Sequence, residues 1–446
     1  MSKMFGGILS TTLILASFFS LFTAANLHQL PLGSSEFPVD DDLNPKWDDE
    51  SCTISRSTAF EVLDGPNSFS SSPSDPINSI KISPLINKTN WEQWEFDGMS
   101  HTGVSLLAIM FSRDYSMHYF GRGNLRVDFF ANTGDGKHHK MLEYLEESTI
   151  LDCPGYTYGI WNSTGKSYSF YTTKNLKYSK LVFDSPTIRG TYKLSATTPP
   201  VHADGSTPGS EGENAADAAL LSPDLYYSQP VAGGKVVMDS VLGSGQKLSF
   251  SGRGGSTRLW AKDGWLPLTE SWVALRLWAG PYTIAYWHVV SRVGEDLGKK
   301  FTSAVLFYND ELLVGTRVGD VSETEDYFLD AYNSGGECGG SYHDNNTGGV
   351  FEFVSPARDK KWRFETQHML MWFELGIGEG LGMSDFADRV VGGEVGGPQY
   401  EGRGLTEQAK FPLYIPQWVV WLLYGVGFLG TKKDYAVDFV RAWSPW

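Results

Sequence analysis

The stretch that decides the fold is Trp91-Glu92-Gln93-Trp94-Glu95-Phe96-Asp97. Successive side chains of a β-strand point to opposite faces of a sheet. A strand here would therefore place the odd-numbered residues on one face and the even-numbered residues on the other. Because aromatic residues in strands usually pack in a core, the simplest interpretation is an ordinary barrel strand. The alternative is a pocket wall that carries a few polar groups.

A second segment, Gly254 to Trp265, repeats this mixture of aromatic and polar residues. From about Ser83 onward, short β-like runs separated by turn residues dominate the chain. They lie at 103–111, 125–130, 167–173, 180–183, 190–196 and 225–241, and then at 272–277, 282–290, 303–308, 311–316, 350–353 and 362–374. Regularly spaced short strands predict an all-β sandwich or barrel, here as two units that meet near residue 250. The best candidate for a helix is 140–147, and the polar segment 196–212 is expected to be a surface loop.

The bulk composition is that of a globular protein rich in aromatic residues. Hydrophobic residues make up 41% of the 446 residues and charged residues 20%, which is typical of a folded chain. Aromatic residues reach 14%, with 15 tryptophans, and such side chains favour rigid cores and apolar pockets. The formal net charge of −16 argues against nucleic acids and anionic membrane surfaces as partners, since both are polyanions.

The N-terminus has the features of a secretory signal peptide. Lys3 precedes the apolar run 8–22, and Thr23-Ala24-Ala25 fits a small-residue cleavage site. We expect residues 1–25 to be removed and residues 26–80, rich in Pro, Ser, Asp and Asn, to form an extended leader. The protein is then expected in the secretory pathway or outside the cell.

Sequons and cysteines agree with this localisation. Glycosylation sequons begin at Asn87, Asn162 and Asn345. The three cysteines permit one disulfide and leave one thiol over. We expect Cys52 to pair with Cys153, which would tie the N-terminal segment to the first domain.

The C-terminal residues 413–446 contain an apolar stretch at 418–429. A bilayer span needs about 20 such residues, so this stretch is too short to cross a membrane. A helix packed on the protein is the first interpretation, because buried apolar segments of this length are common. The alternative is an interfacial segment that brings Trp418, Trp421 and Tyr424 into contact with a membrane surface.

Standard catalytic signatures are missing from the sequence. There is no Gly-x-Ser-x-Gly elbow, no Walker loop and no Rossmann fingerprint. The His and Cys residues also lack the spacing of a metal site. We therefore expect no metal and no cofactor.

Several motifs occur in the order found in the fungal Diels–Alderase family. They are Trp91–Asp97, Ser112-Arg113-Asp114, the run 125–130 with Gly134-Asp135-Gly136, Leu225–Pro230, Gly254–Trp265, Ala279-Gly280-Pro281-Tyr282 and Tyr400–Gly404. From about Trp91 to about Gly404 the chain resembles this family, which forms decalin and related ring systems on polyketide–peptide hybrids. The resemblance implies a β-sandwich-like domain at 81–250 and a lipocalin-like β-barrel at 251–412, followed here by the apolar tail.

The resemblance also nominates catalytic residues, each with a plainer interpretation. Glu95 matches an acidic residue of the family pocket, although a solvated strand carboxylate is about as reasonable. Arg126 and Asp128 match polar groups that line the cavity. They alternate onto one strand face, so they could equally form a structural salt bridge. Tyr227 matches a pocket tyrosine.

The remaining matches concern substrate binding. Ser112 matches a polar cavity residue, and Trp265 matches an aromatic wall. A further wall corresponds to Trp372 or Phe373. Met383 stands where the family is expected to have a pocket lysine that binds an acidic heterocycle, so Arg126 would have to replace that donor or the substrate differs.

These features together predict a cofactor-free cyclase. It would perform an intramolecular [4+2] cycloaddition of a linear polyene precursor made by upstream enzymes of a biosynthetic cluster. The missing lysine favours an isoindolone of the cytochalasan type over a decalin. The alternatives are a lipocalin-like carrier of an apolar metabolite and a cofactor-free hydratase or isomerase, in which burial would have to raise the pKa of Glu95 or Asp128.

Overall fold

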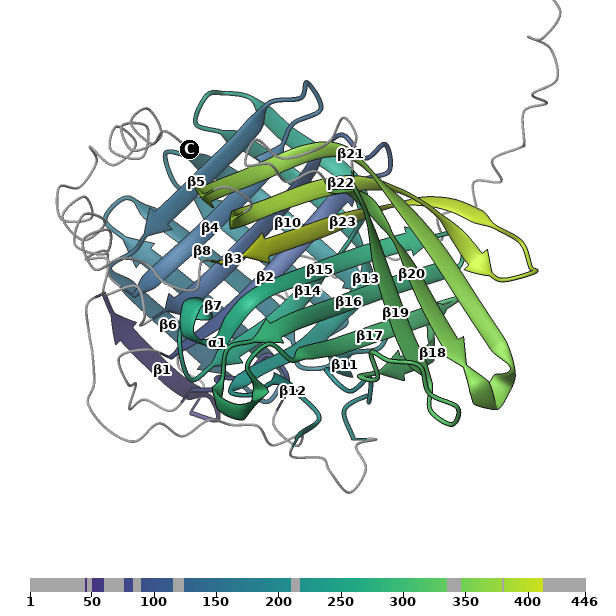
Figure 1. Cartoon of the computed structure of the whole chain (residues 1–446). Helices are drawn as coiled ribbons and strands as arrows, with labels where there is room; N and C mark the ends of the chain where they lie inside the picture. Colours follow the sequence, from purple (N-terminus) through teal and green to yellow (C-terminus); the bar gives the residue numbers. More distant parts are fainter. Residues whose placement is uncertain are drawn as a thin grey trace, which may run out of the picture. The chain divides into compact units, whose positions relative to one another are not determined.

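The computed structural model describes residues 45, 50–59, 76–82, 90–114, 124–209, 217–334, 346–378 and 381–411. Most of these residues belong to two antiparallel β-sheets (Figure 1). The predicted signal peptide, Asn87, Cys338, Asn345 and the apolar tail lie outside the described residues. Within the described part of the chain, we find no helix with the length and apolar character needed to cross a membrane.

The first sheet contains 14 strands in the order β1-β6-β7-β8-β9-β10-β13-β14-β2-β3-β4-β5, with β11 and β12 paired to β13. Their bounds are β1 (Thr53–Thr58), β2 (Trp91–Ser100), β3 (Leu106–Asp114), β4 (Leu125–Asn132), β5 (His138–Tyr144), β6 (Glu147–Asp152), β7 (Tyr156–Ser163), β8 (Lys166–Thr173), β9 (Tyr178–Asp184), β10 (Ile188–Ala196), β11 (Val201–His202), β12 (Leu220–Ser222), β13 (Leu225–Leu242) and β14 (Lys247–Ala261). The long strands β13 and β14 connect its two halves.

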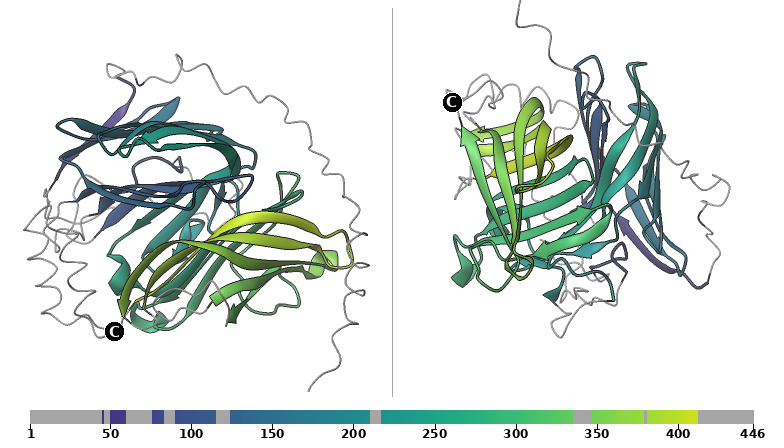
Figure 2. Two further views of the ribbon diagram at one scale, coloured as in Figure 1. Left: turned by 90° about the horizontal axis from the view of Figure 1, so that it is seen from above. Right: turned by 90° about the vertical axis from the view of Figure 1, so that its right-hand side faces the viewer.

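The second sheet contains nine strands in the order β18-β17-β16-β15-β23-β22-β21-β20-β19. Their bounds are β15 (Thr269–Ala279), β16 (Tyr282–Ser291), β17 (Lys300–Tyr308), β18 (Glu311–Thr316), β19 (Tyr327–Ser334), β20 (Asn346–Ser355), β21 (Lys360–Gly378), β22 (Leu381–Glu394) and β23 (Tyr400–Lys410). Short helices lie at α1 (Trp265–Leu268), Gly294–Asp296 and Pro356–Arg358. This sheet curls into a nearly closed barrel (Figure 2). The predicted all-β fold with a lipocalin-like barrel is therefore confirmed.

Strand β2 alternates as its sequence predicts. Trp94 and Phe96 are 1% exposed and belong to the apolar core of the first sheet. Glu92 shares this face and forms a buried ion pair with Arg258, whose guanidinium also lies 3.8 Å from the centre of the Trp94 ring. The opposite face of β2 carries Glu95 and Asp97 toward the second sheet.

Three local expectations differ from the structure. Residues 140–147 form most of strand β5 and the start of β6, because the turn before them, with Gly136 at φ 79°, returns the chain along β4. The segment 196–212 is not simply a surface loop, since Val201 and His202 pair with β13 and are buried. The chain passes between the sheets at 262–268, whereas the domain limits expected from the sequence fall inside β14.

Cys52 and Cys153 form a disulfide, as expected. The bond joins residues separated by 101 positions and lies where β1 pairs with β6. It therefore fixes the N-terminal strand to the edge of the first sheet. Asn162 lies on β7 and is partly exposed, and its glycosylation stays a prediction.

Candidate functional site

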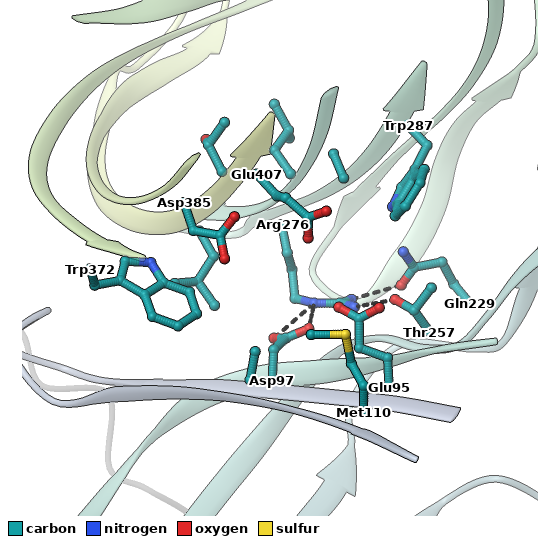
Figure 3. Close-up of a pocket in the computed structure, with 15 residues that line it drawn as sticks. Glu95, Asp97, Met110, Gln229, Thr257, Arg276, Trp287, Trp372, Asp385 and Glu407 are labelled. Carbon is teal, nitrogen blue, oxygen red and sulfur yellow. Dashed lines mark hydrogen bonds and ion pairs between the residues drawn. The ribbon is translucent and has the colours of Figure 1, made fainter. Parts of the chain in front are cut away.

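A pocket lies between the two sheets, with about 520 Å³ of empty space including the part open to solvent. Strands β2, β3, β13 and β14 form one wall, and β15, β16, β21, β22 and β23 form the other (Figure 3). The lining residues are Glu95, Asp97, Ala108, Met110, Gln229, Thr257, Ala274, Leu275, Arg276, Trp287, Trp372, Asp385, Leu405, Thr406 and Glu407. The pocket thus combines apolar and aromatic walls with an unusual concentration of carboxyl groups.

Arg276 joins the two walls. Its Nε donates to both oxygens of Asp97, at 3.0 and 2.8 Å. Its Nη1 donates to the Gln229 side chain at 2.7 Å and to the carbonyls of Val231 and Ala232. The guanidinium is only 5% exposed, so these contacts replace its water shell and fix the first sheet against the second.

Three further carboxyl groups in the pocket form no ion pair with any residue that the structure describes. Asp385 and Glu407 are cross-strand neighbours on β22 and β23, and Glu95 faces them from β2. Burial, followed by the charges of Glu407 and Asp97, raises the pKa of Glu95 to about 8. Burial also raises the pKa of Glu407 to about 7 and the pKa of Asp385 well above its usual value. A large part of this cluster is therefore protonated near neutral pH.

Trp272 determines where the proton of Glu407 lies. Its indole Nε1 donates to Glu407 Oε1 at 2.7 Å. An indole N–H can only donate a hydrogen bond, so Oε1 must act as the acceptor. When Glu407 is neutral, its proton is then on Oε2, and Glu407 can donate from that oxygen.

Two other polar atoms of the pocket have no partner among the described residues. They are Trp372 Nε1, a donor, and Asp385 Oδ1. Both side chains are at most 6% exposed. Buried polar atoms are normally hydrogen-bonded, so these two are suited to contact a bound molecule.

A cluster of closely packed aromatic rings adjoins the pocket. Trp287 lines the pocket and lies 5.6 Å from Tyr227, between ring centres. Trp265 contacts Trp91 at 4.6 Å and Trp272 at 4.5 Å. The rings pack mainly against one another, and this packing makes a rigid apolar wall.

The structure places the predicted site residues in three groups. Glu95 and Trp372 line the pocket directly. Tyr227 accepts a hydrogen bond from the pocket residue Gln229. Trp265 and Met383 are partly buried and pack against the apolar cluster that contains Trp272. These three therefore support the wall from behind.

The remaining predicted residues lie beside the pocket. Arg126 and Asp128 form an ion pair at 2.8 Å, with Asp128 as the cross-strand neighbour of the pocket residue Met110. Burial raises the pKa of Asp128. Burial acts to lower the pKa of Arg126, but Asp128, Tyr144 and Asp114 together outweigh it and raise that pKa. Ser112 is buried and is the cross-strand neighbour of Arg126. The ring centres of Phe373 and Phe130 lie 4.4 Å apart. None of the four is among the lining residues.

Sequence reasoning missed Arg276, Gln229, Asp385 and Glu407. One signal was available, because Arg276 interrupts the apolar run Val273-Ala274-Leu275 and Leu277. A lone guanidinium in such a strand is rarely buried unless it is paired. The two acids gave no comparable signal, since their strands also contain polar residues on exposed faces.

Comparisons with known proteins agree with this architecture. A family profile described as Diels-Alderase-like matches residues 49–412. Hexane cyclase pydB of Acremonium sp. is 54% identical over 412 residues, which cover 92% of this chain and 94% of that protein. Diels-Alderase mycB of Thermothelomyces thermophilus is 41% identical over 421 residues, which cover 93% and 94% of the two chains.

A solved structure shows the same fold. The crystal structure of CghA with Sch210972 matches with a TM-score of 0.67 at 22% identity, and the match covers 81% of this chain and 100% of CghA. The fold, the profile over most of the chain and the relatives named as cyclases lead to one conclusion. The chain belongs to the Diels-Alderase-like family and is an enzyme of the cyclase type.

Proposed function

We propose that this enzyme catalyses an intramolecular [4+2] cycloaddition of a linear polyene precursor. The observation that supports this most directly is the pocket itself, which combines aromatic walls, carboxyl groups with raised pKa values, and a Trp372 N–H that has no partner among the described residues. Such a site can hold and polarise a substrate without forming a covalent bond to it. Diene and dienophile lie in one molecule, so two carbon–carbon bonds form and no atom enters or leaves.

The pocket would lower the barrier in two ways. Its rigid walls would select the folded conformer of the polyene, and well-oriented intramolecular reactions gain large rate factors from such preorganisation. Glu407 Oε2, Glu95 or Trp372 Nε1 would donate a hydrogen bond to a carbonyl conjugated with the dienophile. Fixed donors of this kind stabilise the charge that develops on the oxygen in the transition state.

The names of the relatives support formation of a six-membered carbocycle. Two proteins more than half identical to this chain are named hexane cyclases, and others are named Diels-Alderases. These names do not separate an isoindolone from a decalin product. The preference for an isoindolone rests on Met383 in place of a lysine, and it stays a prediction.

A second candidate is acid-catalysed hydration or isomerisation of a polyene. The raised pKa values of Glu95 and Glu407 favour it, because a neutral acid near pH 7 is a competent proton donor. Hydration adds the mass of water to the substrate, whereas cyclisation leaves the mass unchanged. A carrier of an apolar metabolite would leave both mass and structure unchanged.

Deletion of the gene in its host provides the first test. The proposal predicts loss of one cyclised metabolite and accumulation of an uncyclised isomer or its shunt products, identified by mass spectrometry and NMR. The accumulated isomer then serves as substrate for purified protein. Glu407→Gln and Glu95→Gln should each slow cyclisation, with exposed Glu323→Gln as the matched control. A cyclised product that persists in the deletion strain would refute the proposal.

We also propose that the enzyme works in the secretory pathway. The disulfide between Cys52 and Cys153 supports this localisation, because disulfides persist in oxidising compartments. A shift in electrophoretic mobility after removal of N-linked glycans would test it, with Asn162→Gln as the variant. Protein that shows no glycan and fractionates with the cytosol would contradict the proposal.

A further inference from the structure

A second, smaller pocket also adjoins Arg276. It has about 200 Å³ of empty space, including the part open to solvent. Its lining residues are Thr197, Ala232, Gly233, Gly234, Arg253, Gly254, Arg276, Trp278 and Thr283. No carboxyl group is among these residues, whereas four line the larger pocket. The small pocket therefore offers a ligand cationic groups with no carboxyl group among its lining residues.

Arg253 is the charged residue of this small pocket that lacks a partner. Its side chain is half-buried on β14, on the strand face that also carries Thr257. It forms no ion pair or hydrogen bond with any described residue, and the charge of Asp310 acts on it from beyond 4 Å. Burial of an unpaired charge is costly, so a partner for this guanidinium is missing from the described part of the chain.

Two more cations lie near Arg253. Lys235 is its cross-strand partner on β13, and Met99 is its cross-strand partner on β2. The Arg403 side chain lies close to Met99. A Cβ atom at Gly103 would lie 3.1 Å from the Arg403 side chain and 3.8 Å from the Met99 sulfur. Neither Lys235 nor Arg403 pairs with a described carboxylate. Like charges on directly opposite strand residues destabilise a sheet, and the protein as a whole carries a charge of −16.

We infer that Arg253, together with Lys235 and Arg403, forms a binding site for the carboxylate of a small apolar molecule, or for an oxyanion of similar size. The Trp278 ring provides an apolar contact, and Thr283 provides a hydroxyl group. Gly233 keeps the space open, because a Cβ there would lie 2.7 Å from the Thr283 methyl group. Assigning the molecule to the substrate rests on the proposed function, but the anion site itself does not.

Binding of sorbate tests this inference without any cyclisation. Sorbate is a short dienoic carboxylate, and sorbamide is its uncharged counterpart. Isothermal titration calorimetry at low ionic strength should give roughly tenfold tighter binding for sorbate, since one charge-assisted contact is worth about 1.4 kcal/mol or more. Added salt should reduce the difference, because salt screens partly exposed charges.

Variants locate the preference in this pocket. Arg253→Gln should bring the two affinities to within about twofold of each other, and Arg253→Lys should keep most of the preference. Arg189→Gln removes the same charge from an exposed position on β10 and should behave like the unmodified protein. Equal affinities in the unmodified protein would overturn the inference, and so would a preference that survives in Arg253→Gln. Cyclisation that fails while sorbate binding is retained would instead count against the proposed function.

Discussion

The buried carboxyl groups make folding stability depend on pH, and Glu95 is the group that should show this most clearly. Its pKa is about 8 in the folded protein, compared with 4.5 for an unperturbed glutamate. Between these two values the folded state binds more protons than the unfolded state. Stability therefore falls as pH rises through this range, and it is highest below the pKa of the unfolded chain.

The size of the effect follows from the same two values. At about 1.4 kcal/mol for each pH unit, a pKa raised from 4.5 to about 8 corresponds to about 5 kcal/mol. Of this, about 3 kcal/mol falls between about pH 5.5 and about pH 8.5. Glu95 is partly exposed to the pocket, where solvent reduces the effect. We therefore take about 3 kcal/mol as the upper bound over that range.

The variant Glu95→Gln mimics the neutral acid and should remove this contribution. Its stability should match that of the unmodified protein near pH 5.5 and exceed it by about 1–3 kcal/mol near pH 8.5. Urea unfolding followed by tryptophan fluorescence at several pH values measures the difference, with Glu323→Gln as the exposed control. A flat pH profile in the unmodified protein, or the same slope in Glu95→Gln, would refute the reasoning.

Three further predictions concern other parts of the site and the fold. Trp272→Phe removes the hydrogen bond that lowers the pKa of Glu407, so the alkaline loss of cyclase activity should move to higher pH. The control Trp265→Phe should leave the pH profile in place. Unchanged pH profiles in both variants would contradict the assigned role of the Trp272 indole. Arg276→Met leaves Asp97 buried without its cationic partner and should cost about 3–5 kcal/mol in urea unfolding. A loss below about 1 kcal/mol would show that the ion pair does not hold the sheets together. Cys153→Ser should lower stability by about 2–5 kcal/mol, and a reducing agent should then have no further effect on the variant.

Sequence patterns sufficed for the fold class and for the orientation of β2. Alternation depends only on the two-residue period of a strand, so the opposite faces of Trp94 and Glu95 could be assigned without any tertiary information. The same local reasoning failed at 140–147, where pairing with β4 overrides the helical interpretation. Pairing between strands depends on partners elsewhere in the chain, and a local pattern does not contain them.

The sequence by itself determined that this is an aromatic-rich, all-β protein whose strand Trp91–Asp97 presents acids on one face. It also supplied the resemblance that named Glu95 and Trp372. Only the tertiary structure decided that Arg276 meets Asp97 across 179 positions, and that Asp385 and Glu407 approach Glu95 from another sheet. The raised pKa values were equally beyond the sequence, because they arise from burial and from charges that only the packed sheets bring together.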